Sequence, residues 1–145
     1  MNNRERKRLS TLLVAAAGLG RLAAATAALR AGADPERADR HGTTPLYAAS
    51  VHGAADVVTL LLRAGAAPDT ESGHGTEGTP LCAAACWGHT ETVRELLAHG
   101  ADPRLREDHG TGHTPLHWAE AGSHADTAAV LRTAIARADH SATGR

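Results

Sequence analysis

A short motif that recurs at a nearly fixed spacing is the feature that most restricts how this chain can fold. Thr-Pro-Leu occurs at residues 44–46, 79–81 and 114–116, and Thr11 opens a degenerate first copy that lacks the proline. The four threonines are 33, 35 and 35 residues apart. The first three copies also end in a Gly-Ala pair. A period of this length indicates a repeat protein, in which each unit buries its apolar face against the next one.

Each copy is expected to form two short helices. Proline suits the first position of a helix because its φ angle is preset and its missing N–H would have no partner there. The threonine before it can cap a free N–H of the first turn. Gly53 and Gly88 fit the left-handed position that ends this first helix. A second helix follows, in which apolar residues such as Val57 and Leu61 recur at helical spacing and therefore share one face.

The pattern resembles the ankyrin repeat, a two-helix unit of about 33 residues. The most complete copy, residues 78–102, begins Gly-Thr-Pro-Leu, has Gly-His in its middle and ends Gly-Ala-Asp. Residues 39–44, Asp-Arg-His-Gly-Thr-Thr, match the family's finger loop Asp-x-x-Gly-x-Thr. The last copy departs from the pattern, because Gly122 stands one position early and Ser123 takes the place of the middle glycine.

The resemblance implies an all-α solenoid of four helix-turn-helix units joined by finger loops. We expect a disordered lead-in at residues 1–8 and a loose tail at residues 138–145. The ankyrin-repeat domain is expected to occupy residues 9–137, with repeats at about 9–37, 38–70, 71–104 and 105–137. Four stacked units exceed the minimum of about three that such a fold needs.

Composition narrows the class of protein further. Aromatic residues make up 2% of the chain and phenylalanine is absent, so the core must be built from alanine, leucine and valine. The net charge of −1 gives no basic field for a nucleic acid backbone. No apolar run reaches the roughly 18 residues of a membrane span. One lysine against fourteen arginines is typical of a GC-rich bacterial genome. The two cysteines fit a reducing cytoplasm better than a disulfide framework.

The N-terminal segment has two interpretations. Basic residues between Arg4 and Arg8 precede the apolar run at residues 12–17, which imitates a secretory signal peptide. We favour the first inner helix of the repeat stack instead, because Thr11, Gly20 and Gly32 keep the frame of the repeat.

The resemblance also implies where a partner would bind. Ankyrin-like stacks use their finger loops and the concave face of their inner helices. The repeat period aligns His52, Trp87 and Gly122 along that face, and tryptophan is favoured at binding hot spots. We therefore expect Trp87 to be the main anchor, whereas Trp118 is expected to pack internally. The predicted partner-binding residues are Arg40, His41, Thr43, Val51, His52, Glu77, Cys86, Trp87, His109 and His113.

Cysteine and histidine residues suggest two other roles. Cys82 and Cys86 are four residues apart on one helix and share a face, so that with nearby histidines they suit a soft metal such as zinc or copper(I). Only two of the required three or four ligands are identified, which favours small packing residues. A row of histidines in the finger loops, His41, His74 and His109, would charge between about pH 7 and 6 and alter partner affinity. The alternative is that histidine is simply tolerated in exposed loops.

Catalysis has little support in the sequence. No serine lies in a Gly-x-Ser-x-Gly setting, and no phosphate-binding Gly-x4-Gly-Lys loop is present. Ankyrin units form a shallow groove, whereas catalysis usually needs a pocket. We therefore predict a cytoplasmic, monomeric, non-catalytic module that binds a partner protein, with no cofactor, no nucleic acid and no membrane. A metal- or small-molecule-binding protein built on Cys82 and Cys86 is the alternative, and an enzyme on the same scaffold is a third.

Overall fold

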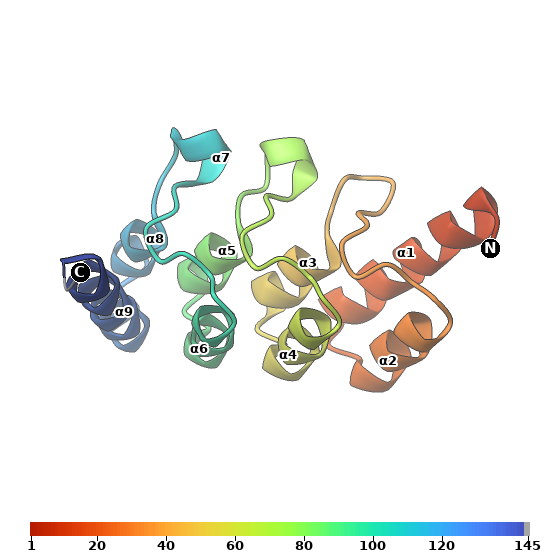
Figure 1. The fold of residues 1–145 in the computed structure, drawn as a ribbon, viewed down its shortest axis with the longest axis horizontal. Coiled ribbons are helices and arrows are strands. Elements are labelled where there is room, and N and C mark those ends of the chain that lie inside the picture. The colour runs from red at the N-terminus through yellow and green to blue at the C-terminus, as the bar shows by residue number, and fades with distance from the viewer. Residues whose placement is uncertain (144–145) are drawn as a thin grey trace.

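The computed structural model describes residues 1–143, and these form helix pairs arranged in a row (Figure 1). A finger loop leads from each pair to the next, and the second and third loops each carry one helical turn. The pairs are α1 (Asn3–Gly18) with α2 (Leu22–Arg30), α3 (Pro45–His52) with α4 (Ala55–Arg63), α5 (Pro80–Cys86) with α6 (Thr90–Ala98), and α8 (Pro115–Ala121) with α9 (Ala125–Thr143). The loop turns are the 3-10 turn η1 (Gly73–Gly75) and α7 (Glu107–Gly110).

The helices form two layers. The inner helices α1, α3, α5 and α8 pack against one another in that order, and the outer helices α2, α4, α6 and α9 do the same behind them. The finger loops project from the stack on one side (Figure 1). We call the surface formed by the finger loops and the inner helices the concave face. The predicted all-α stack of paired helices is therefore confirmed.

The Thr-Pro pairs start helices as predicted. In α3, α5 and α8 the proline is the first helical residue and the preceding threonine is the cap. The hydroxyls of Thr44, Thr79 and Thr114 accept hydrogen bonds from the N–H three residues later, at 3.3, 3.2 and 3.2 Å. Each threonine thus satisfies a donor that the helix cannot satisfy itself.

The same positions of successive repeats supply the buried core residues. Leu61, Leu96 and Leu131 stand at one position of successive outer helices, and each is fully buried. Ala49, Ala84 and Ala119 stand at one position of successive inner helices, and they are fully buried as well. A side chain as small as alanine lets neighbouring inner helices approach closely, while the leucines supply most of the buried apolar area.

The expected disordered lead-in is wrong, because helix α1 already begins at Asn3. The side chain of Asn2 accepts a hydrogen bond from the Glu5 N–H at 2.9 Å, and the Glu5 carboxylate accepts one from the Asn2 N–H at 3.2 Å. This capping box starts the helix nine residues earlier than a cap at Thr11 would have done. Thr11 lies inside α1 and its hydroxyl donates to the carbonyl of Lys7.

The expected loose tail is also wrong for its described part, because α9 continues to Thr143. Residues 137–143 contain no glycine or proline, so nothing in the sequence ends the helix there. Arg104, in the third finger loop, also forms an ion pair with Asp139. Residues 144–145 of the expected tail lie outside the described residues.

The segment that imitates a signal peptide packs into the stack. Leu13 and Ala17 in α1 are fully buried, and α1 lies against both α2 and α3. In residues 1–143, no helix combines the length and the apolar character needed to cross a membrane.

Replacing Ser123 by glycine should stabilise the protein. Ser123 has φ +58° and occupies the left-handed position that glycine holds in the second and third repeats. For a residue with a β-carbon, this conformation destabilises the folded state by roughly 1–2 kcal/mol. Glycine removes this strain, but its greater flexibility stabilises the unfolded state and offsets part of the gain. We expect Ser123→Gly to raise the free energy of unfolding by about 0.5–1 kcal/mol. Urea denaturation measures this change, and a destabilised variant would contradict it.

Candidate functional site

Contacts between neighbouring loops turn the finger loops into one connected surface. The Gly73 N–H donates to the carbonyl of Gly42 at 2.8 Å, and the Thr44 N–H donates to the hydroxyl of Ser72 at 3.0 Å. The next pair of loops is joined by the carboxylate of Glu71, which accepts a hydrogen bond from the N–H of His109 at 2.8 Å. The turns η1 and α7 consequently lie against each other (Figure 1).

The loop histidines take part in this packing. The His74 ring lies against Gly42, where a β-carbon would fall 2.7 Å from its Nε2 atom. The His109 ring lies in the same way against Gly75. His41, in the first loop, accepts a hydrogen bond from the Arg40 side chain at 3.0 Å. Two of the three histidines therefore have a structural role in joining the loops, while pH sensing by the row stays a hypothesis.

A hollow of about 250 Å³ lies where the loops meet the inner helices. We call it the central hollow. Trp87 stands at its edge, at the end of α5, with 63% of its surface exposed. Helices α3, α5 and α8 and the second and third loops all contribute to it, so it spans three repeats. Its lining residues are Tyr47, Thr76, Glu77, Cys82, Ala83, Cys86, Trp87, Glu107, Asp108 and Trp118.

The acidic side chains of the central hollow are held by neutral donors. Oε1 of Glu77 accepts hydrogen bonds from the hydroxyls of Thr43 at 2.9 Å and Ser72 at 3.0 Å. Oε1 of Glu107 accepts one from the indole N–H of Trp118 at 2.8 Å. Within residues 1–143 the structure shows no ion pair for either carboxylate. The hollow therefore carries uncompensated negative charge.

The pKa values of its neutral side chains reflect this charge. Burial raises the pKa of Tyr47, and the carboxylates of Glu77 and Glu107 raise it further. Burial also raises the pKa of the Cys82 thiol to about 12, with a smaller contribution in the same direction from Glu107. Both groups are neutral near pH 7, so the carboxylates determine the charge of the site.

Comparison with known proteins agrees with this architecture. The family model described as Ankyrin repeats (3 copies) matches residues 1–72 and again residues 67–142. The chain belongs to the ankyrin repeat family. The predicted family is therefore confirmed; ankyrin repeats are typically protein–protein interaction modules, and the family is usually non-catalytic. None of the curated proteins compared with this ankyrin chain matches it.

The ankyrin stack brings only part of the predicted set into the central hollow. Glu77, Cys86 and Trp87 line it, and Thr43 contacts it through its bond to Glu77. His113 lies close by, with its ring stacked on His117 at 3.8 Å between centroids. The remaining predicted residues lie elsewhere on the concave face or in the loops: Arg40, His41, Val51, His52 and His109.

The turn between the two helices of a unit links each ankyrin unit to the one before it. Nε2 of His89 lies 3.0 Å from the carbonyl oxygen of Val51, and Nε2 of His124 lies 3.0 Å from that of Cys86. Because a carbonyl oxygen only accepts, each Nε2 must carry the hydrogen. These bonds satisfy carbonyls at the ends of α3 and α5 that the helices leave free.

Seven of the ten residues that line the central hollow lie outside the predicted partner-binding set: Tyr47, Thr76, Cys82, Ala83, Glu107, Asp108 and Trp118. Trp118 is half-buried and packs on the core as expected, but it also lines the hollow. The sequence does contain a signal for Glu107, because the 35-residue period places it at the position of Ser72. Ser72 lies at the base of its loop, where its side chain reaches Thr44 at the start of an inner helix.

The geometry does not support a metal site at the two cysteines. No group of three or more histidine, cysteine, aspartate or glutamate side chains within residues 1–143 is arranged to hold a metal ion. Cys82 is buried and its thiol lies 3.7 Å from the carbonyl of His113, to which it donates. Cys86 is half-buried.

The two thiols should react very differently. Only the thiolate is nucleophilic, and with a pKa of about 12 fewer than roughly one in a thousand Cys82 thiols is ionised at pH 8. Cys82 is also buried, whereas Cys86 is partly accessible. We expect iodoacetamide at pH 8 to modify Cys86 and spare Cys82, and the Cys86→Ser variant to remain unmodified, as read by mass spectrometry. Equal modification of both cysteines would contradict the burial of Cys82.

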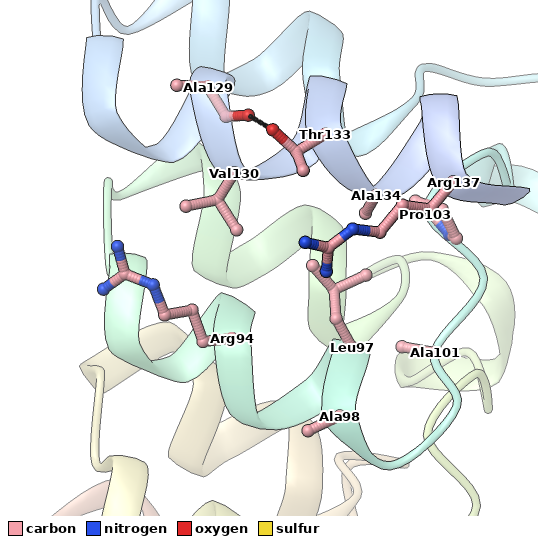
Figure 2. A pocket seen from close by; sticks show the side chains of 10 residues that line it. All are labelled: Arg94, Leu97, Ala98, Ala101, Pro103, Ala129, Val130, Thr133, Ala134 and Arg137. Atoms are coloured by element: carbon pink, nitrogen blue, oxygen red, sulfur yellow. Dashed lines mark hydrogen bonds between the residues drawn. The ribbon is translucent and has the colours of Figure 1, made fainter.

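A larger groove of about 630 Å³ lies on the outer layer, between α6 and α9. Figure 2 shows the side chains that line it, among them Leu97 on α6 and Val130 and Ala134 on α9. The small side chains of Ala129 and Ala134 leave this space open. The groove lies outside the concave face, and sequence reasoning did not predict it.

Proposed function

We propose that this protein is a non-catalytic interaction module that binds a partner protein through its concave face, with Trp87 as the anchor. One observation carries the proposal. Leu19 and Trp87, at 67% and 63% exposure, are the two most exposed large hydrophobic side chains of residues 1–143. They occupy the same position in the first and third repeats, at the ends of α1 and α5, and the exposed His52 stands between them in the second.

An exposed tryptophan of this kind suits a binding hot spot. Burying Trp87 would remove a large apolar area from water, and the polar groups around it would form the rim of the interface. The adjoining central hollow has a volume of about 250 Å³, below the range of roughly 300–1,000 Å³ typical of ligand and active-site pockets. A side chain of a protein partner fits such a hollow better than a separate substrate does. The cytoplasmic location and the monomeric state stay predictions.

The test is capture of a partner from a lysate of the source organism, with wild-type protein compared with the Trp87→Ala, His52→Ala variant. Truncating a hot-spot tryptophan costs about 2 kcal/mol or more, which weakens binding roughly 30-fold. We expect a protein retained by the wild type to be lost by the variant. Leu22→Ala is the matched control, because Leu22 is an exposed apolar residue on the outer helix α2.

Circular dichroism must show that the variant is folded before its binding is compared. A specifically retained protein that binds the double variant and the wild type equally would contradict the proposed face. Loss of that protein in the Leu22→Ala control would contradict it as well.

A further inference from the structure

The central hollow combines negative charge with aromatic side chains. Glu77 comes from the second loop, and Glu107 and Asp108 come from the third. Trp87 and Trp118 contribute indole rings from two neighbouring inner helices, and Tyr47 contributes a phenol from a third. Aromatic rings attract cations through their faces, so both kinds of side chain favour the same type of ligand.

The described residues contain no group that already neutralises this charge. The carboxylates of Glu77 and Glu107 are fixed by hydroxyl and indole donors, which orient them but carry no charge. Arg106 is the arginine next to them in the chain, and its guanidinium donates to the carbonyl of Gly112 at 3.2 Å. The pKa of Tyr47 is raised chiefly by burial, and Glu77 and Glu107 raise it further because their carboxylates lie close to the phenol.

The dimensions and the exposure of the site select a single side chain. A hollow of about 250 Å³ is too small for most separate ligands, but it can hold the end of one long side chain. Trp87, exposed at its edge, offers a surface on which a planar group can stack. The guanidinium of arginine is planar, stacks on aromatic faces and bonds carboxylates through two parallel N–H groups, whereas the lysine ammonium is a compact and strongly hydrated point charge.

We propose that the central hollow binds an arginine side chain of the partner protein, with the guanidinium stacked at Trp87 and bonded to the carboxylates of Glu77 and Glu107. This inference rests on the proposed function and specifies the chemistry of the partner. It predicts that the partner presents an exposed basic segment to the concave face.

The test uses N-acetyl-arginine amide as the probe and its neutral isostere, N-acetyl-citrulline amide, as the comparison. The chain has two tryptophans, so its spectrum contains two indole N–H signals, which the Trp87→Phe variant assigns. We expect the arginine probe to shift both signals saturably and to bind at least fivefold more tightly than the citrulline probe. Equal binding of the two probes, or no saturable shift, would overturn the proposal. Equally tight binding of N-acetyl-lysine amide would overturn the choice of arginine.

Charge-removing variants locate the site. We expect Glu107→Gln to weaken binding of the arginine probe at least fivefold, although the glutamine amide oxygen can still accept the Trp118 hydrogen bond and hold the loop. Glu77→Gln should act in the same direction. Glu91→Gln is the matched control, because Glu91 is exposed on the outer helix α6 and forms an ion pair with Arg94 there. Unchanged binding in both hollow variants would overturn the assignment.

The experiment separates this inference from the proposed function. A captured partner that depends on Trp87 but is indifferent to Glu77→Gln and Glu107→Gln would overturn the arginine proposal and leave the concave face as the binding surface. Suppose instead that the arginine probe binds tightly and that a captured partner binds the Trp87→Ala, His52→Ala variant as well as the wild type. This result would overturn the proposed binding face and leave the central hollow as an arginine site.

Discussion

Replacing Leu61 by alanine is expected to lower the free energy of unfolding by about 2–5 kcal/mol. Leu61 is fully buried in the outer helix α4, in the second of the four repeats. The outer helices α2 and α6 flank α4, so a cavity at this position loosens contacts on both sides. In a repeat protein the stability is approximately a sum of units and interfaces, and an interior unit contributes to two interfaces.

Chemical denaturation followed by circular dichroism measures the effect of Leu61→Ala. Leu12→Ala is the matched control, because Leu12 lies in helix α1 with 48% of its surface exposed. This substitution removes the same atoms as Leu61→Ala but leaves no cavity. We expect the control to cost well under about 1 kcal/mol. Similar losses in the two variants would show that Leu61 is not buried between the outer helices.

Replacing Gly53 by alanine is expected to cost about 2–3 kcal/mol. Gly53 ends helix α3 with φ +69°, where a β-carbon causes roughly 1–2 kcal/mol of backbone strain. The new β-carbon would also lie 2.5 Å from Nδ1 of His89. The ring must then move and weaken its hydrogen bond to the carbonyl of Val51, which is worth about 0.5–1.5 kcal/mol.

Gly20→Ala separates these two contributions. Gly20 has φ +66° at the equivalent position of the first repeat, but a β-carbon there would meet only the side chain of Ala54, at an ordinary contact distance of 3.6 Å. It should therefore show the backbone strain alone. A Gly53→Ala variant as stable as Gly20→Ala would mean that His89 does not link the second and third repeats. Thermal and urea denaturation of the two variants provide the comparison.

Local sequence signals were sufficient for most of the fold. The Thr-Pro pairs specified helix starts through bonds between residues three apart, and the 33- to 35-residue period specified that units stack. The two corrections concern the ends of the chain. Asn2 and Glu5 have the spacing of a capping box, which starts the first helix at Asn3, and the C-terminal helix continues because no residue of 137–143 breaks it.

The site depended on information that the sequence alone does not contain. The period predicts that Trp87 is aligned with His52, and the structure shows that Trp87 is exposed. It did not show that Leu19 would also be exposed, or that Glu107 would bond to Trp118 and line the same hollow as Glu77.

The sequence by itself determined the helix pairs and their order, because capping, turn chemistry and apolar periodicity act over a few residues and then repeat. Only the tertiary structure decided which side chains share the central hollow. Those side chains come from positions as far apart as Tyr47 and Trp118, on three helices and two loops. Their proximity depends on how closely the alanine-lined inner helices pack and on how each loop bonds to its neighbour, and neither is specified within any one repeat.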